Sequence, residues 1–219
     1  MNFCYEVCME KLLIATYNRG KFQQIKAILD DLPYEIVGLN DLEVEDSDFE
    51  EIYETYAENA MLKAQYYSEK TGFLTLADDS GIEVDVLEGE LGAKTRRWGA
   101  GADATDEEWI EHFLKVMKDV PEEKRTGRFL CYAAVVDPGE KVEEKVFKGV
   151  IEGKITQELE APIIPGLPLS SCFRPDGFDK VIAGLEEGDR TQINHRGKAI
   201  SKAKEYLMKV FKLYKNDES

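Results

Sequence analysis

Short apolar runs alternate with amphipathic stretches along most of this chain. The run Leu-Leu-Ile-Ala at 12–15 predicts a buried strand within 11–16, and apolar residues then recur at helical spacing from Phe22 to Leu32, which predicts a helix. The same reasoning predicts, in order, a strand at 34–39, a helix at 55–70, a strand at 73–77, a helix at 105–119, strands at 128–136 and 141–151 joined by a turn, a further strand within 153–159, and a last helix that carries Ile200 to Phe211. A proline-rich loop at 161–171 is unusually apolar for a surface segment.

The order of these elements predicts an α/β fold. Strand–helix units come first and a β-hairpin follows, which indicates a mixed sheet flanked by helices, in two lobes with a central substrate cleft. We expect a single domain at 11–214, with a short N-terminal leader at 1–10 and a polar tail at 215–219.

Charge and composition exclude several classes of function. A net charge of -16 over 219 residues argues against a duplex nucleic-acid binder, which needs a basic face. No apolar run approaches the roughly 20 residues that span a bilayer, and residues 1–10 lack the basic start and apolar centre of a signal peptide, so we expect no membrane partner. The cysteines form no Cys-x-x-Cys pair, which favours reduced thiols and a cytoplasmic protein.

Two adjacent carboxylates, Asp78 and Asp79, follow the strand predicted at 73–77. Because Asp and Gly are poor strand formers, Asp78, Asp79, Ser80 and Gly81 predict that this strand ends at the acids, at the rim of the sheet. Neighbouring side chains on an extended backbone point in opposite directions, so the two acids cannot perform the same task. Without other evidence, an ordinary acidic turn is the better interpretation of this segment.

A polar turn follows the first predicted strand. It consists of Thr16, Tyr17, Asn18, Arg19, Gly20 and Lys21. A turn of this kind between a strand and a helix N-terminus can receive phosphate on its backbone N–H groups, with Asn18 as the helix cap and Lys21 as an added charge. A simple capped turn explains Asn18 and Gly20 equally well.

Cations lie at the boundaries of the predicted elements, and three acids could supply oxygen ligands for a metal. The cations are Lys21, Arg190, His195 and Arg196, and the acids are Glu51, Asp78 and Asp79. Carboxylate oxygens are suitable ligands for Mg²⁺, and cations together with a metal and a glycine-bearing turn indicate a polyphosphate substrate. A lone histidine at a helix start more often caps or packs, so His195 supports this interpretation only together with Arg190 and Arg196.

Taken together, these segments resemble the inosine/xanthosine triphosphate pyrophosphatase family, the Ham1-like enzymes. The matching motifs are Thr16-Tyr-Asn-Arg-Gly-Lys21, Thr55-Tyr-Ala-Glu-Asn-Ala-Met-Leu-Lys-Ala64, Ala77-Asp-Asp-Ser-Gly-Ile-Glu-Val-Asp85, Arg97-Trp98, Phe129-Leu-Cys131 and Asn194-His-Arg-Gly-Lys-Ala199. Each motif is modest by itself, but they follow the order of the family across nearly the whole chain.

The resemblance implies a fold, an activity and a set of roles. The family has an elongated α/β fold with a long mixed sheet, usually forms homodimers, and uses Mg²⁺ to hydrolyse ITP, dITP and XTP to the monophosphate and pyrophosphate, which sanitises the nucleotide pool. By motif, Asp79 and Lys21 would be catalytic, and Glu51 and Asp79 would bind the metal. The residues that would contact the substrate are Thr16, Tyr17, Asn18, Arg19, Gly20, Lys21, Ser80, Leu167, Pro168, Leu169, Ser170, Arg190, His195 and Arg196.

One loop departs from the pattern of the family. Where the family has a Gly-Phe-Gly-Tyr-Asp-Pro-type loop whose aromatic side chain stacks on the purine, this chain has Gly166-Leu-Pro-Leu-Ser-Ser-Cys-Phe173. Leu167 cannot stack as an aromatic ring does, and Pro168 removes a backbone donor. Three alternatives therefore stay open: an enzyme with a shifted base preference, a catalytically silent nucleotide-binding protein, and a Maf-like pyrophosphatase, which the motifs fit less well.

Overall fold

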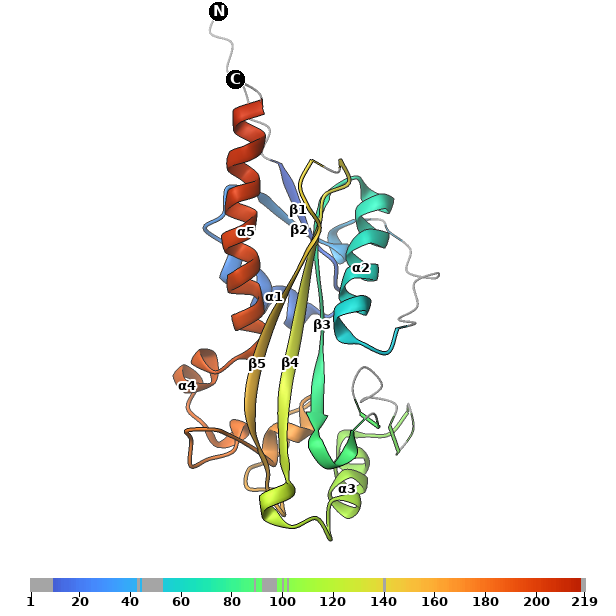
Figure 1. The fold of residues 1–219 in the computed structure, drawn as a ribbon, viewed down its shortest axis with the longest axis vertical. Coiled ribbons are helices and arrows are strands. Elements are labelled where there is room, and N and C mark those ends of the chain that lie inside the picture. Colours follow the sequence, from blue (N-terminus) through green and yellow to red (C-terminus); the bar gives the residue numbers. More distant parts are fainter. Residues whose placement is uncertain are drawn as a thin grey trace, which may run out of the picture.

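The computed structural model describes residues 10–42, 44, 53–88, 90–91, 98–99, 101, 103–139 and 141–217. These residues form a six-stranded sheet with helices on both faces (Figure 1). The strands are β1 (Lys11–Ile14), β2 (Glu35–Gly38), β3 (Leu74–Val84), β4 (Thr126–Val136), β5 (Lys145–Ile155) and β6 (Phe173–Pro175). The α-helices are α1 (Arg19–Leu29), α2 (Tyr56–Thr71), α3 (Asp106–Val116), α4 (Glu187–Gln192) and α5 (His195–Asp217).

The sheet is mixed, as the order of the predicted elements indicates. Its strand order is β2-β1-β3-β4-β5-β6. The strand β1 pairs in parallel with β2 and β3, whereas the pairs from β3 through β6 are antiparallel. The strands β3, β4 and β5 run along the length of the molecule and extend well beyond β1 and β2 (Figure 1). The predicted α/β fold class is therefore confirmed.

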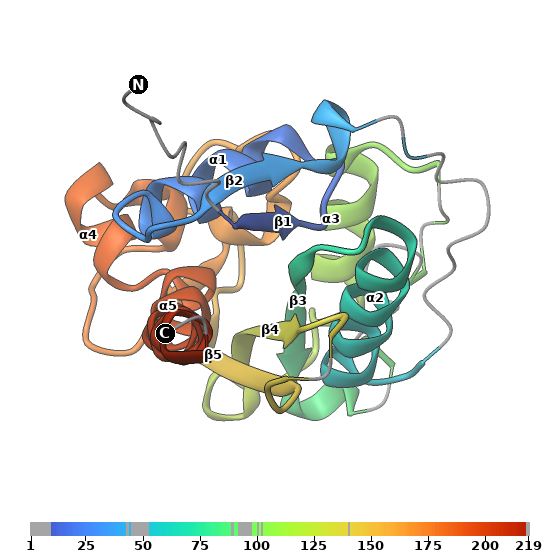
Figure 2. The same ribbon diagram turned by 90° about the horizontal axis from the view of Figure 1, so that it is seen from above.

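Alternating side chains of the strands form separate apolar clusters on the two faces of the sheet. On one face, Leu12 and Ile14 pack with α1 and α5. On the other face, Leu13 and Ala15 pack with α2. Figure 2 shows α5 and α2 on either side of β3 and β4. Because both faces are covered, the short strands of this region read as continuous apolar runs in the sequence.

A third apolar cluster lies at the other end of the long strands, around α3 (Figure 1). It joins the last residues of β3, such as Ile82 and Val84, to Trp109 and Phe113 of α3. The helix begins with a capping box, in which the Thr105 side chain accepts a hydrogen bond from the backbone N–H of Glu108.

Several predicted boundaries are wrong. The strand predicted to end at the two aspartates continues to Val84, because β4 hydrogen-bonds to it along the whole of Thr75–Val84. The second hairpin strand begins at Lys145 and absorbs the separate strand predicted within 153–159. The short elements β6 and α4 have no clear period in the sequence and were not predicted.

Gly81 has a packing role in β3 and does not end the strand. A Cβ atom at Gly81 would lie 2.3 Å from the hydroxyl oxygen of Tyr56, the first residue of α2. Tyr56 donates a hydrogen bond to the Ile82 carbonyl at 3.3 Å, so its ring lies directly on the strand. A glycine is needed where a side chain from another element approaches the backbone this closely.

Side chains of α5 cover the outer edge of β5, which β6 pairs only at Gly153–Ile155. The Nζ atom of Lys198 donates to the Val150 carbonyl at 2.9 Å, and that of Lys202 donates to the Lys148 carbonyl at 2.6 Å. The hydroxyl of Tyr206 bonds to the Glu143 carbonyl just before the strand. Because these three side chains recur every four residues along the helix, they bind carbonyl groups on an edge that would otherwise be open to pairing with another chain.

None of the described helices combines the length and low polarity needed to cross a bilayer.

Candidate active site

The candidate site lies on the part of β3 that extends past the end of β1. The register of β1 with β3 ends at Ile14 opposite Leu76. Among the described strands, the following residues of β3, including Asp78, Asp79 and Ser80, pair only with β4. The acids therefore lie at a rim of the sheet, as predicted, although the strand itself continues. Such edges beyond the carboxyl ends of parallel strands are where α/β proteins bind ligands.

The two aspartates face opposite sides of the sheet. Asp78 shares its face with Leu76 and points to the side covered by α1 and α5, whereas Asp79 shares its face with Ala77 and points to the side of α2. The expectation that the two side chains point in opposite directions is confirmed.

Asp78 is the centre of a buried ionic cluster. Its Oδ2 atom lies 3.3 Å from Nζ of Lys21 and 3.1 Å from Nε of Arg196, and its side chain is 1% exposed. Burial by itself would raise the pKa of this carboxyl, but the charges of Lys21 and Arg196 outweigh it and lower the pKa to about 2. Asp78 is therefore ionised at neutral pH, and it binds both cations.

Arg196 is held by three acceptors from two other elements. Besides Asp78, its Nη2 atom donates to Oγ of Ser80 at 3.0 Å and its Nη1 atom donates to Oε1 of Gln24 at 2.9 Å. Gln24 was not predicted as a site residue. It lies one helical turn after Lys21 on α1, so the helical period could have identified it.

The N-terminus of α5 brings Arg196 to this position. Oδ1 of Asn194 accepts hydrogen bonds from the backbone N–H groups of Arg196 and Gly197 at 3.0 and 3.3 Å. The helix also contacts β5 closely, because a Cβ atom at Gly149 would lie 2.0 Å from the His195 carbonyl oxygen. A glycine in β5 therefore permits the approach that puts Arg196 beside Asp78.

The turn from β1 to α1 places Lys21 on the same side. Oδ1 of Asn18 accepts a hydrogen bond from the Lys21 backbone N–H at 3.0 Å, which confirms the predicted cap. Oγ1 of Thr16 accepts from the Asn18 N–H at 3.2 Å, and the Tyr17 hydroxyl donates to the Val44 carbonyl at 2.8 Å. The exposed Arg19 and Gly20 begin the helix, so their N–H groups lie at its positive end, next to the ionic cluster around Asp78.

Asp79 has a different set of contacts. Its Oδ1 atom accepts a hydrogen bond from the Ser80 backbone N–H at 2.8 Å, and the residue is 8% exposed. The described residues contain no group of three side chains that could hold a metal by themselves. Mg²⁺ is commonly held by one or two carboxylates together with substrate phosphates, so the hard oxygens of Asp79 fit this ion.

The second predicted metal ligand, Glu51, lies outside the described residues, as does Arg97 of the glycine-rich loop. The chain resumes at Tyr53, and Asn59 of α2 fixes it there. Oδ1 of Asn59 accepts from the Tyr53 N–H at 3.0 Å, and its Nδ2 atom donates to the Tyr53 carbonyl at 3.1 Å.

His195 and Arg190 differ from the other predicted cations. The ring of His195 stacks on Phe129 with the centroids 5.4 Å apart. Burial and the charge of Arg196 lower the pKa of His195 to about 3, so the imidazole is neutral at neutral pH and was wrongly predicted as a cation. Arg190 is half-buried on α4, and no described contact joins its side chain to Asp78.

The loop at 166–171 is partly a structural element. Gly166 has a φ of 77°, and its N–H donates to Oδ2 of Asp106 at the start of α3. Pro168, Leu169 and Ser170 are buried in a short 3₁₀ helix, η5 (Pro168–Ser171), and Leu169 belongs to the cluster around α3. Leu167 is 56% exposed. The apolar composition of the loop is thus explained by packing, with Leu167 as its exposed apolar side chain.

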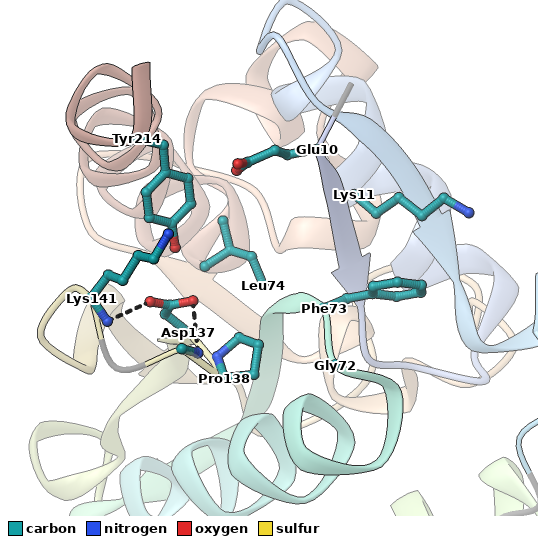
Figure 3. A pocket seen from close by; sticks show the side chains of 10 residues that line it. Glu10, Lys11, Gly72, Phe73, Leu74, Asp137, Pro138, Lys141 and Tyr214 are labelled. Carbon is teal, nitrogen blue, oxygen red and sulfur yellow. Dashed lines mark hydrogen bonds between the residues drawn. The ribbon is translucent and has the colours of Figure 1, made fainter. Parts of the chain in front are cut away.

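A pocket of about 300 Å³ lies away from these residues, at the opposite end of β1 and β3 (Figure 3). Its lining includes Lys11 and Leu74, which begin the two strands, and Tyr214 near the end of α5. The Asp137 carboxylate in this pocket binds the backbone N–H groups of Gly139 and Lys141, so it serves the hairpin turn. The pocket contains none of the predicted site residues.

Comparisons with known proteins agree with the sequence motifs. A family model described as the Ham1 family matches residues 12–206. A protein of Oceanobacillus iheyensis named dITP/XTP pyrophosphatase is 35% identical over 199 residues, which are 91% of this chain and 98% of that protein. A protein of the same name from Caldanaerobacter subterraneus subsp. tengcongensis is 37% identical over 92% of this chain and 98% of its own length.

Solved structures also resemble this fold. A HAM1 protein from Coxiella burnetii superposes with a TM-score of 0.82 at 28% identity, covering 92% of this chain and all of that one. The Ham1 protein of Staphylococcus aureus gives a TM-score of 0.79 at 33% identity, over 90% of this chain and 98% of its own.

Proposed function

The chain belongs to the Ham1 family, and from this premise we propose that it is a hydrolase of deaminated purine nucleoside triphosphates. The substrates would be ITP, dITP and XTP, and the products the nucleoside monophosphate and pyrophosphate. The observation that carries the proposal is the cluster at the free edge of β3, where Lys21 and Arg196 lie on one side of the strand and the Asp79 carboxylate on the other.

The side of Lys21 and Arg196 suits the triphosphate. Pyrophosphate leaves with a large negative charge, and fixed cations that stabilise this charge in the transition state accelerate the reaction. The first turn of α1 adds the positive end of a helix next to Lys21. We assign phosphate binding to Thr16–Lys21, Ser80 and Arg196. As a neutral imidazole, His195 would contribute a hydrogen bond and not a charge.

The side of Asp79 suits the attacking water. A carboxylate at this position can orient the water and accept its proton, a contribution of about 10²–10⁴-fold to the rate. We propose that Asp79 and Glu51 hold Mg²⁺, which would neutralise charge on the phosphate oxygens. In-line attack on the α-phosphorus places the water opposite the leaving pyrophosphate. The water would therefore lie on the α2 side of β3, and the pyrophosphate would leave on the α1 side, where the cations lie.

The base preference depends on the loop at 166–171. Leu167 offers an apolar surface without an aromatic ring, and stacking on a ring is worth roughly 0.5–1.5 kcal/mol beyond burial. We therefore propose that the enzyme accepts deaminated purines but discriminates among bases less strongly than a protein with an aromatic residue at this position would. The buried Pro168, Leu169 and Ser170 would shape the loop, and Arg190 would act from α4.

A panel of substrates tests the proposal. ITP, dITP, XTP, GTP, ATP and the pyrimidine triphosphates are incubated with Mg²⁺, and monophosphate and pyrophosphate are measured separately. We expect the fastest release of pyrophosphate with ITP, dITP and XTP. Comparable rates with pyrimidine triphosphates would assign a shifted base preference. Nucleotide binding without any turnover would replace the proposal with a silent nucleotide-binding protein.

A matched variant examines the base loop in the same panel. Leu167→Phe restores an aromatic side chain at the exposed position without changing the buried residues of η5. The expected result is a larger ratio of the ITP rate to the rates with pyrimidine triphosphates, because an aromatic ring stacks over the larger surface of a purine. An unchanged ratio would separate Leu167 from base selection.

We further propose that residues 11–214 form a single domain and that the protein acts in the cytoplasm as a homodimer. Light scattering coupled to size-exclusion chromatography measures the mass of the assembly directly, and a monomeric mass at micromolar concentration would contradict the dimer.

A further inference from the structure

The position of Asp78 presents a physical problem. A carboxylate next to a site for a triphosphate repels the ligand, and a buried carboxylate is unfavourable unless it is paired. The Oδ2 atom of Asp78 nevertheless forms an ion pair with Lys21 and accepts a hydrogen bond from Arg196, and its buried Oδ1 atom has no hydrogen-bond partner within the described part of the chain. Catalysis by Asp79 does not explain why a carboxylate is also present at Asp78, so Asp78 needs an explanation of its own.

The two cations keep donors that Asp78 does not use. A guanidinium has five N–H donors, and the contacts of Arg196 with Asp78, Ser80 and Gln24 occupy three of them. Lys21 has three donors on the ammonium group that forms the ion pair with Asp78. Two cations against one carboxylate also leave one positive charge of this group uncompensated. Donors and charge are thus available for an anion.

We propose that Asp78 is a positioning residue that fixes the Lys21 ammonium and the Arg196 guanidinium on the edge of β3, so that together they receive the phosphates. The inference rests on the proposed function, whose phosphate site it describes in more detail. Long cationic side chains lose conformational entropy when they bind a ligand. A buried anchor already restricts them in the free protein, so less entropy is lost on binding. Arg196 on α5 and Lys21 on α1 are otherwise far apart in the sequence.

The direction in which Asp78→Asn changes the affinity for an anion distinguishes a positioning role from a simple charge effect. If Asp78 only adds negative charge near the phosphates, its neutralisation in Asp78→Asn must strengthen the binding of an anion. If Asp78 positions the two cations, the same substitution must weaken that binding, although the net charge has become more favourable.

The experiment measures binding of inorganic pyrophosphate by calorimetry to the full-length protein, without metal and without turnover. We expect wild type to bind pyrophosphate, Asp78→Asn to bind it about tenfold more weakly, and Lys21→Met to bind it more weakly as well. Because Asp78 acts through Lys21 as well as through Arg196, only the part that acts through Arg196 is left to lose in the Lys21→Met background, and the double variant should bind no more than about threefold more weakly than Lys21→Met alone. Asp85→Asn is the matched control, since Asp85 pairs with Arg128 beyond the end of β3 and should leave the affinity unchanged.

A second variant covers the case in which Asp78→Asn does not fold. Gln24→Ala removes one acceptor of Arg196 from the exposed side of α1 and leaves β3 intact. It should weaken pyrophosphate binding about two- to threefold, and it should have no further effect in the Arg196→Met background.

The outcomes distinguish this inference from the proposed function. Tighter or unchanged binding by Asp78→Asn, additive losses in the double variant, or no pyrophosphate binding by wild type would overturn the positioning role. Unchanged affinity of Gln24→Ala would also overturn it. Turnover of ITP is measured separately in wild type: loss of pyrophosphate affinity in Asp78→Asn without any wild-type turnover would support the positioning role and reject the hydrolase.

Discussion

At the scale of single residues, the alternation of side chains along β3 gives the adjacent aspartates different surroundings. Asp78 is turned to α1 and α5, where its partners are Lys21 and Arg196, whereas Asp79 is turned to α2. A shift of the strand by one residue would exchange the two positions and pair the cations with the wrong acid. The ten-residue register of β3 with β4, from Thr75 to Val84, holds the strand against such a shift.

Asp79→Asn should reduce turnover at least about 100-fold, because an amide cannot accept the proton of the attacking water. The substitution keeps the shape of the side chain, so the thermal unfolding temperature should remain close to that of wild type. Pyrophosphate release from ITP measures the rate, with Asp176→Asn in an exposed turn as the control. A rate equal to that of wild type would remove Asp79 from the mechanism.

His195 should make the stability of the protein depend on pH. Its folded-state pKa is about 3 against 6.5 for an ordinary histidine, so between these values the unfolded chain binds the proton and the folded chain does not. Stability therefore falls as the pH decreases below 6.5, by at most about 1.4 kcal/mol per pH unit from this residue.

Urea unfolding of wild type and His195→Gln at pH 7 and pH 5 measures this effect. The variant should lose less free energy of unfolding than wild type on acidification, because glutamine does not titrate. Equal losses in the two proteins would show that His195 is not kept neutral by the fold.

At the scale of elements, the contact between β5 and the start of α5 determines where Arg196 lies. A methyl group at residue 149 would meet the backbone of His195 and Ala199 at 2.0 and 2.6 Å. Backbone atoms of a packed helix cannot rotate away as a flexible side chain can, so the helix must move.

Gly149→Ala should therefore destabilise the protein by about 1–3 kcal/mol and also raise KM, since displacement of α5 moves Arg196 away from Asp78. Gly184→Ala is the matched control, because its new methyl group would meet no atom closer than 3.8 Å. Thermal unfolding and steady-state kinetics of both variants test the prediction. A Gly149→Ala protein with wild-type stability would contradict the close contact.

Sequence reasoning identifies elements well where one strong signal is present and fails where the tertiary contacts decide. The turn at 16–21 could be predicted because its cap and its strand–helix setting are local. The length of β3 could not, since Asp78 and Gly81 disfavour a strand locally and only pairing with β4 and the approach of Tyr56 overrule that preference.

Arg125 illustrates the same limit. In the sequence it looks like a surface arginine in a polar turn, but it is 1% exposed, and its guanidinium donates to the carbonyls of Met117, Val120, Ile155 and Thr156. No local pattern indicates that backbone carbonyls from two distant segments converge on it.

At the scale of the whole molecule, a strongly acidic protein binds an acidic substrate. The net charge of -16 repels a triphosphate at long range, so capture depends on the local field of Lys21, Arg196 and the start of α1. The same net charge also destabilises the folded state, because like charges repel one another in the compact chain.

The unfolding temperature should therefore rise as NaCl is increased from about 0.01 to 0.1 M, where the screening length falls from about 30 to 10 Å. Differential scanning calorimetry at neutral pH measures it, and KCl in place of NaCl controls for binding of a particular ion. A falling unfolding temperature would mean that attractive ion pairs outweigh the net repulsion.

The cover that α5 provides for the edge of β5 limits how this helix can change in evolution. Lys198, Lys202 and Tyr206, which recur every four residues along α5, donate to three carbonyl groups of β5 and of the segment just before it. One inserted residue between them would rotate every later side chain by about 100° about the helix axis. Replacement of single residues in this part of α5 is therefore far better tolerated than a change in its length, and the distance in sequence from Arg196 to Tyr206 is expected to be fixed among relatives that keep this edge.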